Sequence, residues 1–121
     1  MPQAVVVGAG PGGLAVAAML KRGGIETVVV DRADAVGSAW RNHYERLHLH
    51  TVRWLSHLPG YKIPREFGKW VARDDVVRYL EQYAAHHRLN VQLGTEISRI
   101  DREGDGWVLR SPQGDINATY V

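Results

Sequence analysis

The first 32 residues place a glycine-rich turn between an apolar run and a helix-like stretch, and this order constrains the fold more than any other feature. The run Ala4–Val7 leads directly into the glycine-rich segment 8–13. The pattern predicts a helix over 14–21 and a second strand over 27–30, which ends at Asp31. Strand, glycine turn, helix, strand and acid in this order form a dinucleotide-binding fingerprint.

The glycines of this turn have separate roles in such a fingerprint. Gly8 permits the sharp turn out of the strand, and Gly10 has no side chain, so a pyrophosphate can approach the backbone. Gly13 lets the helix pack closely against the strand. Pro11 suits the first helical turn, where its missing N–H is no loss. Together with Gly12, this turn presents free N–H groups and the positive end of the helix dipole to a phosphate.

The acidic residue at the end of the second strand indicates which nucleotide is preferred. The Asp31 carboxylate can accept hydrogen bonds from both ribose hydroxyls, and it would repel a 2′-phosphate, so the site should prefer FAD or NAD over NADP. Arg32 flanks the adenosine edge or is simply solvated. The residues alone leave FAD and NAD equally open. A phosphate-loop NTPase is excluded, because no Gly-Lys-Ser/Thr follows the glycines.

Length and composition exclude several classes of protein. At 121 residues the chain is one domain at most, and its net charge of +2 comes from scattered basic residues, so neither nucleic acid nor a membrane surface is expected as a partner. No apolar run reaches transmembrane length and no signal peptide is evident, so the expected compartment is the cytoplasm. The absence of cysteine excludes a disulfide framework and argues against the disulfide-reductase branch of FAD proteins.

Histidines gather in the middle of the chain without the pattern of a metal site. His48, His50 and His57 have no carboxylate or cysteine at ligand spacing, so no metal is predicted.

A long aromatic segment, from about residue 33 to 73, separates the fingerprint from the next predicted helix. Connections of this length are usually lids or binding segments. Leu47 and Leu49 suggest a short extended piece inside it. The next helix is predicted over 74–87 with Asp74 as its N-cap. Four further strands are expected at 90–93, 96–101, 107–110 and 116–121.

These elements predict an α/β fold. We expect a Rossmann-like domain whose parallel sheet is followed by a β-meander, as in the FAD domain of flavoproteins with two dinucleotide-binding domains. The sequence ends inside a predicted strand, so residues 1–121 are interpreted as a partial FAD-binding domain, truncated at the C-terminus.

Three segments resemble the flavin-containing monooxygenase family, and in particular the plant auxin-forming monooxygenases and their bacterial relatives. The first is the glycine turn over 7–15. The second is the run Tyr-Glu-Arg-Leu-His-Leu-His at 44–50, and the third covers 63–84 and includes Phe-Gly-Lys-Trp at 67–70. The latter two are more specific than the glycine motif, which many FAD enzymes share.

This resemblance implies roles for individual residues. The turn 8–13 would hold the FAD pyrophosphate, and Asp31 would hold the adenosine ribose. Gly37, Ser38 and Trp40 would line the flavin end, and the backbone of Ile97 would meet the adenine.

The resemblance also implies a reaction. Such enzymes reduce FAD with NADPH and add O₂ to form a C4a-hydroperoxyflavin, which passes one oxygen atom to a small-molecule substrate. His50 falls at the polar position beside the reactive edge of the flavin, which makes it the candidate catalytic residue for positioning the oxygenated flavin.

The second nucleotide motif, expected for NADPH, is absent from this sequence. We therefore interpret the chain as the N-terminal FAD-binding part of such an enzyme, inactive alone because the NADPH-binding domain is missing. Two alternatives stay open: the NAD-binding domain of a non-flavin dehydrogenase, and a catalytically inactive fragment that binds no cofactor tightly. The sequence does not indicate an oligomeric state.

Overall fold

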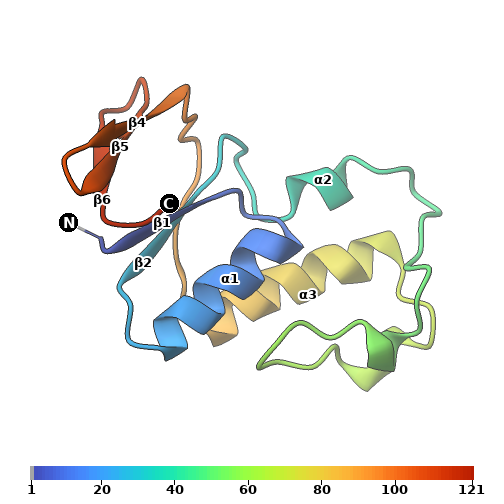
Figure 1. The fold of residues 1–121 in the computed structure, drawn as a ribbon. Helices are drawn as coiled ribbons and strands as arrows, with labels where there is room; N and C mark the ends of the chain where they lie inside the picture. Colours follow the sequence, from blue (N-terminus) through green and yellow to red (C-terminus); the bar gives the residue numbers. More distant parts are fainter. Residues whose placement is uncertain (1) are drawn as a thin grey trace.

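The computed structural model describes residues 2–121, which form a parallel sheet, an antiparallel meander and helices beside them (Figure 1). The parallel sheet has the order β1-β2-β3, with β1 at Ala4–Val7, β2 at Thr27–Val30 and β3 at Asn90–Gln92. The meander consists of β4 at Arg99–Glu103, β5 at Gly106–Arg110 and β6 at Ile116–Ala118. The predicted α/β fold, a Rossmann-like parallel sheet followed by a β-meander, is confirmed.

The helices differ in length. The two longer ones are α1 at Pro11–Arg22 and α3 at Arg73–His86. The short helix α2 and two 3₁₀ turns lie between them, at Ser38–Arg41, Arg53–Leu55 and Arg65–Phe67. None of the helices within residues 2–121 has the length and apolar character needed to span a membrane.

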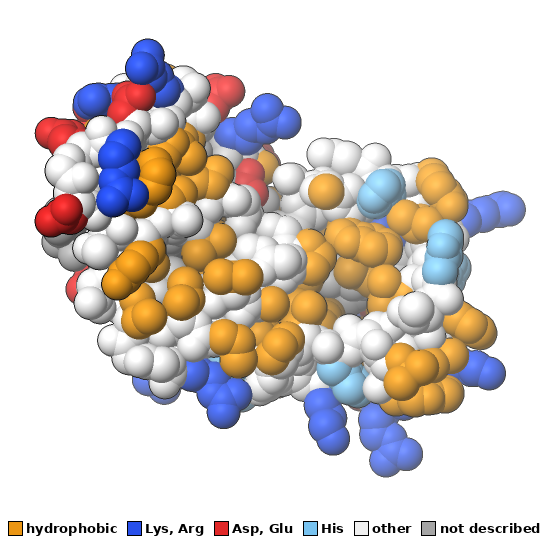
Figure 2. Space-filling model, viewed as in Figure 1, with side chains coloured by type: hydrophobic (Ala, Val, Ile, Leu, Met, Phe, Trp, Pro, Cys, Tyr) orange, Lys and Arg blue, Asp and Glu red, His pale blue; other side chains and the backbone are white. Residues whose placement is uncertain are grey.

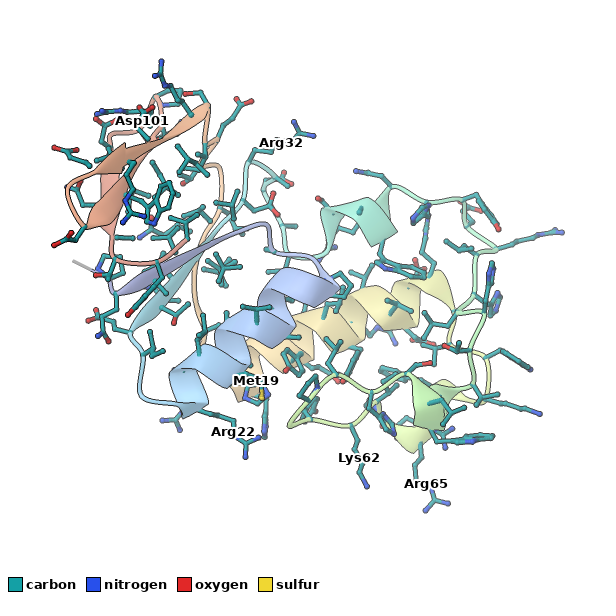
Figure 3. The ribbon with its side chains drawn as sticks, viewed as in Figure 1. Met19, Arg22, Arg32, Lys62, Arg65 and Asp101 are labelled. Atoms are coloured by element: carbon teal, nitrogen blue, oxygen red, sulfur yellow. The ribbon has the colours of Figure 1, made fainter. Side chains whose placement is uncertain are left out.

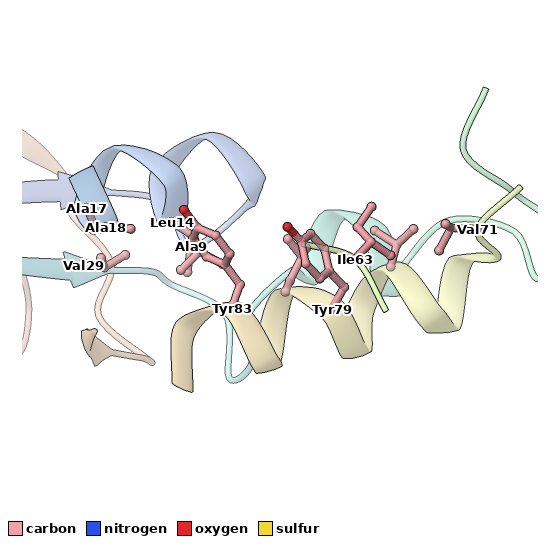
Figure 4. Packing of buried hydrophobic residues seen from close by; sticks show 11 residues of the cluster. Ala9, Leu14, Ala17, Ala18, Val29, Ile63, Val71, Tyr79 and Tyr83 are labelled. Atoms are coloured by element: carbon pink, nitrogen blue, oxygen red, sulfur yellow. The ribbon is translucent and has the colours of Figure 1, made fainter. Parts of the chain in front are cut away.

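The parallel sheet lies between a layer of helices and the meander, and the valines of β2 pack against both. Val29 is fully buried in a cluster with α1 and α3, which includes Leu14 and Tyr83 (Figure 4). Val28 and Val30 belong to a second cluster with side chains of the meander. Because successive strand side chains point to opposite faces, helices cover one face of the sheet and the meander covers the other. Burying each valine contributes about 1.5–3 kcal/mol.

The glycine turn is the tightest part of the fold. Gly8 has a φ of +112°, in the left-handed region that side chains other than glycine rarely adopt. A Cβ on Gly13 would lie only 1.9 Å from the Gly8 carbonyl oxygen. The backbone of α1 therefore packs directly on the end of β1, and only glycine fits at position 13.

The two longer helices begin before their predicted ranges. Helix α1 begins at Pro11, ahead of the predicted range 14–21 and at the proline expected in its first turn. Helix α3 begins at Arg73, and its N-cap is Ala72, which makes no side-chain capping bond. Asp74, the predicted N-cap, lies inside the first turn, where its carboxylate contacts the Arg73 guanidinium at 2.9 Å.

The strand predicted at 96–101 begins later, at Arg99, because the preceding residues cross between the two sheets. The Thr95 N–H still bonds to the Asp31 carbonyl beside the parallel sheet (2.9 Å). The Ser98 N–H bonds to Arg110 in the meander (2.9 Å). The last predicted strand ends at Ala118, and Tyr120 pairs instead with β1, where its carbonyl accepts the Val5 N–H at 3.0 Å.

The aromatic segment folds back on itself and is anchored on α3. Its predicted extended piece is present, since the Leu49 N–H bonds to the Val71 carbonyl at 2.8 Å. Two buried tyrosines of α3 hold the loop 57–63. The Tyr79 hydroxyl accepts the Leu58 N–H (2.9 Å), and the Tyr83 hydroxyl donates to the Pro59 carbonyl (2.5 Å).

Two half-buried histidines, His57 in this loop and His87 at the end of α3, have pKa values below the ordinary one. The His57 Nδ1 accepts the Ile63 N–H at 2.8 Å, which requires an unprotonated Nδ1. Burial lowers the pKa of His57, and the neighbouring Lys62 and Arg53 lower it further. Burial also lowers the pKa of His87.

We predict that Gly13→Ala destabilises the chain by about 1–3 kcal/mol or more, because the new methyl group meets backbone atoms that cannot move aside. Gly12→Ala is the matched control, because a Cβ there has no neighbour within 4 Å. Urea unfolding of both variants measures the difference. Equal free energies of unfolding for the two variants would show that α1 does not pack on β1 in this way.

We also predict that the free energy of unfolding falls as the pH drops below about 6.5. The unfolded chain then binds more protons than the folded chain, whose His57 pKa is lowered. His57→Asn keeps an acceptor near the Nδ1 position but does not titrate, so its loss of stability between pH 7.5 and pH 5.5 should be smaller. Identical pH dependence of wild type and variant would contradict this assignment.

Candidate functional site

Within residues 2–121, the N-terminus of α1 has no side-chain capping hydrogen bond. Gly10 is the N-cap residue and offers no side-chain bond, and the first turn contains no acidic residue. The first N–H groups of a helix have no intrahelical partner, and the helix dipole makes this end positive. A Cβ at Gly10 would have no neighbour within 4 Å. The turn therefore presents exposed backbone to a space that an anion can enter.

The turn is fixed from behind through Ala9, which is fully buried. The Ala9 N–H donates to Oδ2 of Asp31 at 2.7 Å, and the Ala9 carbonyl accepts the Gly37 N–H at 2.9 Å. The Gly8 N–H donates to the Val30 carbonyl at 2.7 Å. Because these contacts occupy Gly8 and Ala9, the N–H groups of the following turn are left to face a ligand.

Asp31 directly follows β2, at the strand end where it was predicted, and its carboxylate already has protein partners. Oδ1 accepts the Ala33 N–H at 2.9 Å, while Oδ2 accepts the Ala9 N–H. Each carboxylate oxygen retains a free lone pair, so ribose hydroxyls can still be accepted. The two amides were missed by sequence reasoning because alanines give no side-chain signal. Arg32 is exposed and projects outward from the loop after β2 (Figure 3).

A mostly apolar pocket of about 300 Å³ opens beside the first residue of α1, next to α2 (Figure 2). Pro11 and Trp40 line it together with the buried Val71, Tyr79 and Leu80. Thr51 and Ser56 also line it, and their hydroxyl oxygens lie 2.5 Å apart. These hydroxyls were not predicted, since the chain brings them together only through the fold of the aromatic segment.

The three residues predicted at the flavin end lie close to the turn in the chain's fold. Gly37 contacts Ala9 directly, as described above, and Ser38 is the first residue of α2. Trp40 is half-buried, lines the pocket and meets His43 edge-to-face with ring centroids 5.5 Å apart. The structure thus brings Gly37 into contact with Ala9 of the glycine turn, and Trp40 into the same pocket lining as Pro11.

His50 and Ile97 lie outside the pocket. The neighbours Leu49 and Thr51 line the pocket, whereas the His50 side chain is exposed and does not line it. Ile97 is half-buried against the meander-side cluster, two residues after the Thr95 amide that bonds to Asp31. Within residues 2–121 no group of three His, Cys, Asp or Glu side chains is arranged to hold a metal ion.

Comparison with known proteins places the chain among flavoprotein relatives. The family model for pyridine nucleotide-disulphide oxidoreductase matches residues 5–121. A probable indole-3-pyruvate monooxygenase, YUCCA3 of Arabidopsis thaliana, is 45% identical over 71% of this chain and 20% of its own length. A CzcO-like uncharacterized oxidoreductase of Geobacillus kaustophilus is 32% identical over 97% of this chain and 34% of its own length.

Solved structures of flavoproteins have the same fold as this chain. A flavin-containing monooxygenase from Stenotrophomonas maltophilia superposes with a TM-score of 0.91 and 29% identity, over 98% of this chain and 36% of that protein. The bacillithiol disulfide reductase of Staphylococcus aureus has the same TM-score at 18% identity, which shows a shared fold. The chain spans about a third or less of the relatives it matches. The chain therefore belongs to the pyridine nucleotide-disulphide oxidoreductase family, and its resemblance within that family is to the flavin monooxygenases.

Proposed function

We propose that this chain is the FAD-binding part of an FAD- and NADPH-dependent monooxygenase, with NADPH bound by a domain outside these residues. The observation that carries the proposal is the uncapped N-terminus of α1 behind a glycine turn that Ala9 holds in place. Backbone N–H groups at such a helix end form an anion site suited to a pyrophosphate.

The residues present fit FAD along the whole turn. The open space at Gly10 lets a pyrophosphate approach the backbone, and the free lone pairs of Asp31 can accept ribose hydroxyls. On the other side, the apolar pocket beside Pro11 and Trp40 offers a surface to the flavin end. When bound, the flavin supplies the redox chemistry, while the protein orients it and limits access of water.

Charge and the named relatives support FAD as the nucleotide of this turn and a monooxygenase as the whole protein. The Asp31 carboxylate would repel a 2′-phosphate, which supports FAD over NADP in this turn. The chain has no cysteine, so these residues cannot form the redox-active pair of a disulfide reductase. The relatives named above as monooxygenases support transfer of one oxygen atom from O₂ to a small-molecule substrate.

We predict that Gly10→Val abolishes FAD binding but leaves the fold intact. Gly10 has φ −87° and ψ −173°, which valine adopts, and its side chain would extend into the open space that the pyrophosphate needs. Quenching of flavin fluorescence during titration of FAD measures binding. Gly23→Ala, at the other end of α1, is the control, because its Cβ makes only an ordinary contact with backbone oxygen at 3.4 Å. Equal affinity in both variants would contradict the proposed pyrophosphate position.

We propose that the reactive edge of the flavin lies at the rim of the apolar pocket, beside the exposed side chain of His50, whose chain neighbours Leu49 and Thr51 line the pocket. Nuclear magnetic resonance of the histidine rings during FAD titration tests this placement. We expect the His50 ring protons to shift more than those of His86, which stacks on Tyr61 with ring centroids 4.4 Å apart. An unchanged His50 signal, together with shifts at the glycine turn, would remove His50 from the flavin site.

A further inference from the structure

We infer that Asp31 is a positioning residue that sets the glycine turn before any nucleotide binds, acting through the backbone of Ala9. This role deepens the proposed function and depends on it only for the effect on nucleotide affinity. The first evidence is burial. Ala9 has no exposed surface, so its N–H cannot exchange the Asp31 carboxylate for water without opening the turn. A buried N–H left without an acceptor is costly.

The Asp31 carboxylate is itself held in place. Its second oxygen accepts the Ala33 N–H, two residues along the chain, in a short-range contact that aspartate and asparagine side chains form readily. The Asp31 backbone is fixed as well, because its N–H donates to Gln92 (3.1 Å) and its carbonyl accepts the Thr95 N–H (2.9 Å). The carboxylate therefore cannot swing toward a ligand without breaking one of these contacts.

These contacts connect three segments at one buried residue, Ala9. The end of β2 supplies the carboxylate, the segment before α2 supplies the Gly37 N–H on the Ala9 carbonyl, and the turn itself leads into α1. Hydrogen bonds to a charged group are shorter and stronger than neutral ones, in agreement with the 2.7 Å from the Ala9 nitrogen to Oδ2 of Asp31. The turn is thus held by protein contacts before any ligand binds.

If Asp31 only held the ribose, substitutions at Asp31 would leave the ligand-free chain unchanged. If Asp31 positions the turn, the same substitutions change the turn even without a ligand. The two roles are therefore separated by measurements on the ligand-free 121-residue chain.

Amide hydrogen exchange, followed by nuclear magnetic resonance, is the test. In Asp31→Ala both the Ala9 and the Ala33 amides should exchange about 10-fold faster or more, because both lose a charged acceptor. Asp31→Asn keeps the size of the side chain but only one acceptor oxygen, so at least one of the two amides should exchange faster than in the wild type. The Val29 amide in the core reports on global unfolding and should be unchanged.

Asp34→Asn is the matched control, because it removes one nearby negative charge from an exposed side chain. Its Ala9 and Ala33 amides should exchange as in the wild type. If Asp31→Ala does not fold, Asp31→Asn decides. Exchange of both amides in Asp31→Asn at the wild-type rate would overturn the inference.

Titration of FAD into the same variants separates this inference from the proposed function. Asp31→Ala should weaken FAD binding about 10-fold or more, and Asp34→Asn should not. If the wild-type chain binds no FAD, the proposed function fails, while the exchange rates of the ligand-free chain still decide the role of Asp31. Accelerated Ala9 exchange with unchanged FAD affinity would show that the position of the turn does not govern nucleotide binding, and would overturn that part of the inference.

Discussion

The fold and the site both depend on the backbone contacts of one buried residue, Ala9. Its N–H and its carbonyl are held by Asp31 and Gly37, which follow β2 and precede α2. Through these two bonds the glycine turn, the end of the sheet and the start of the aromatic segment keep one relative position. The methyl side chain of Ala9 is itself part of the helix-side core, so packing and hydrogen bonding fix the same point.

The aromatic segment and α3 form a pocket beside this turn. Helix α3 supplies the buried tyrosines that hold the loop 57–63, and the stretch around Leu49 pairs with the chain that leads into α3. As a result, side chains far apart in the sequence line one apolar space beside Pro11. The meander stands on the opposite face of the sheet, so it supports the strands without contributing to the lining of this pocket.

The strands and the turn could be predicted because their signals are local. Valine runs and a glycine turn define β1 and β2 with the residue limits that the structure has. The short helix α2, the bond from Ala9 to Asp31 and the hydroxyl pair of Thr51 and Ser56 could not be predicted. The Ala9 amide lies 22 residues from Asp31, and neither a backbone amide nor the conformation of an irregular segment leaves a pattern in a single sequence. The predicted Asp74 cap is wrong because the helix begins one residue earlier, at Arg73, and the Asp74 carboxylate pairs with the Arg73 guanidinium.

The central claim is that this turn binds the pyrophosphate of a dinucleotide, and competition for bound FAD tests it most directly. ADP carries the adenosine and pyrophosphate of FAD without the flavin, whereas FMN carries the flavin with a single phosphate. In a calorimetric titration of FAD into the 121-residue chain, we expect saturable binding at one site, displaced by ADP and far less by FMN. Absence of FAD binding, or displacement by FMN as effective as by ADP, would contradict the account.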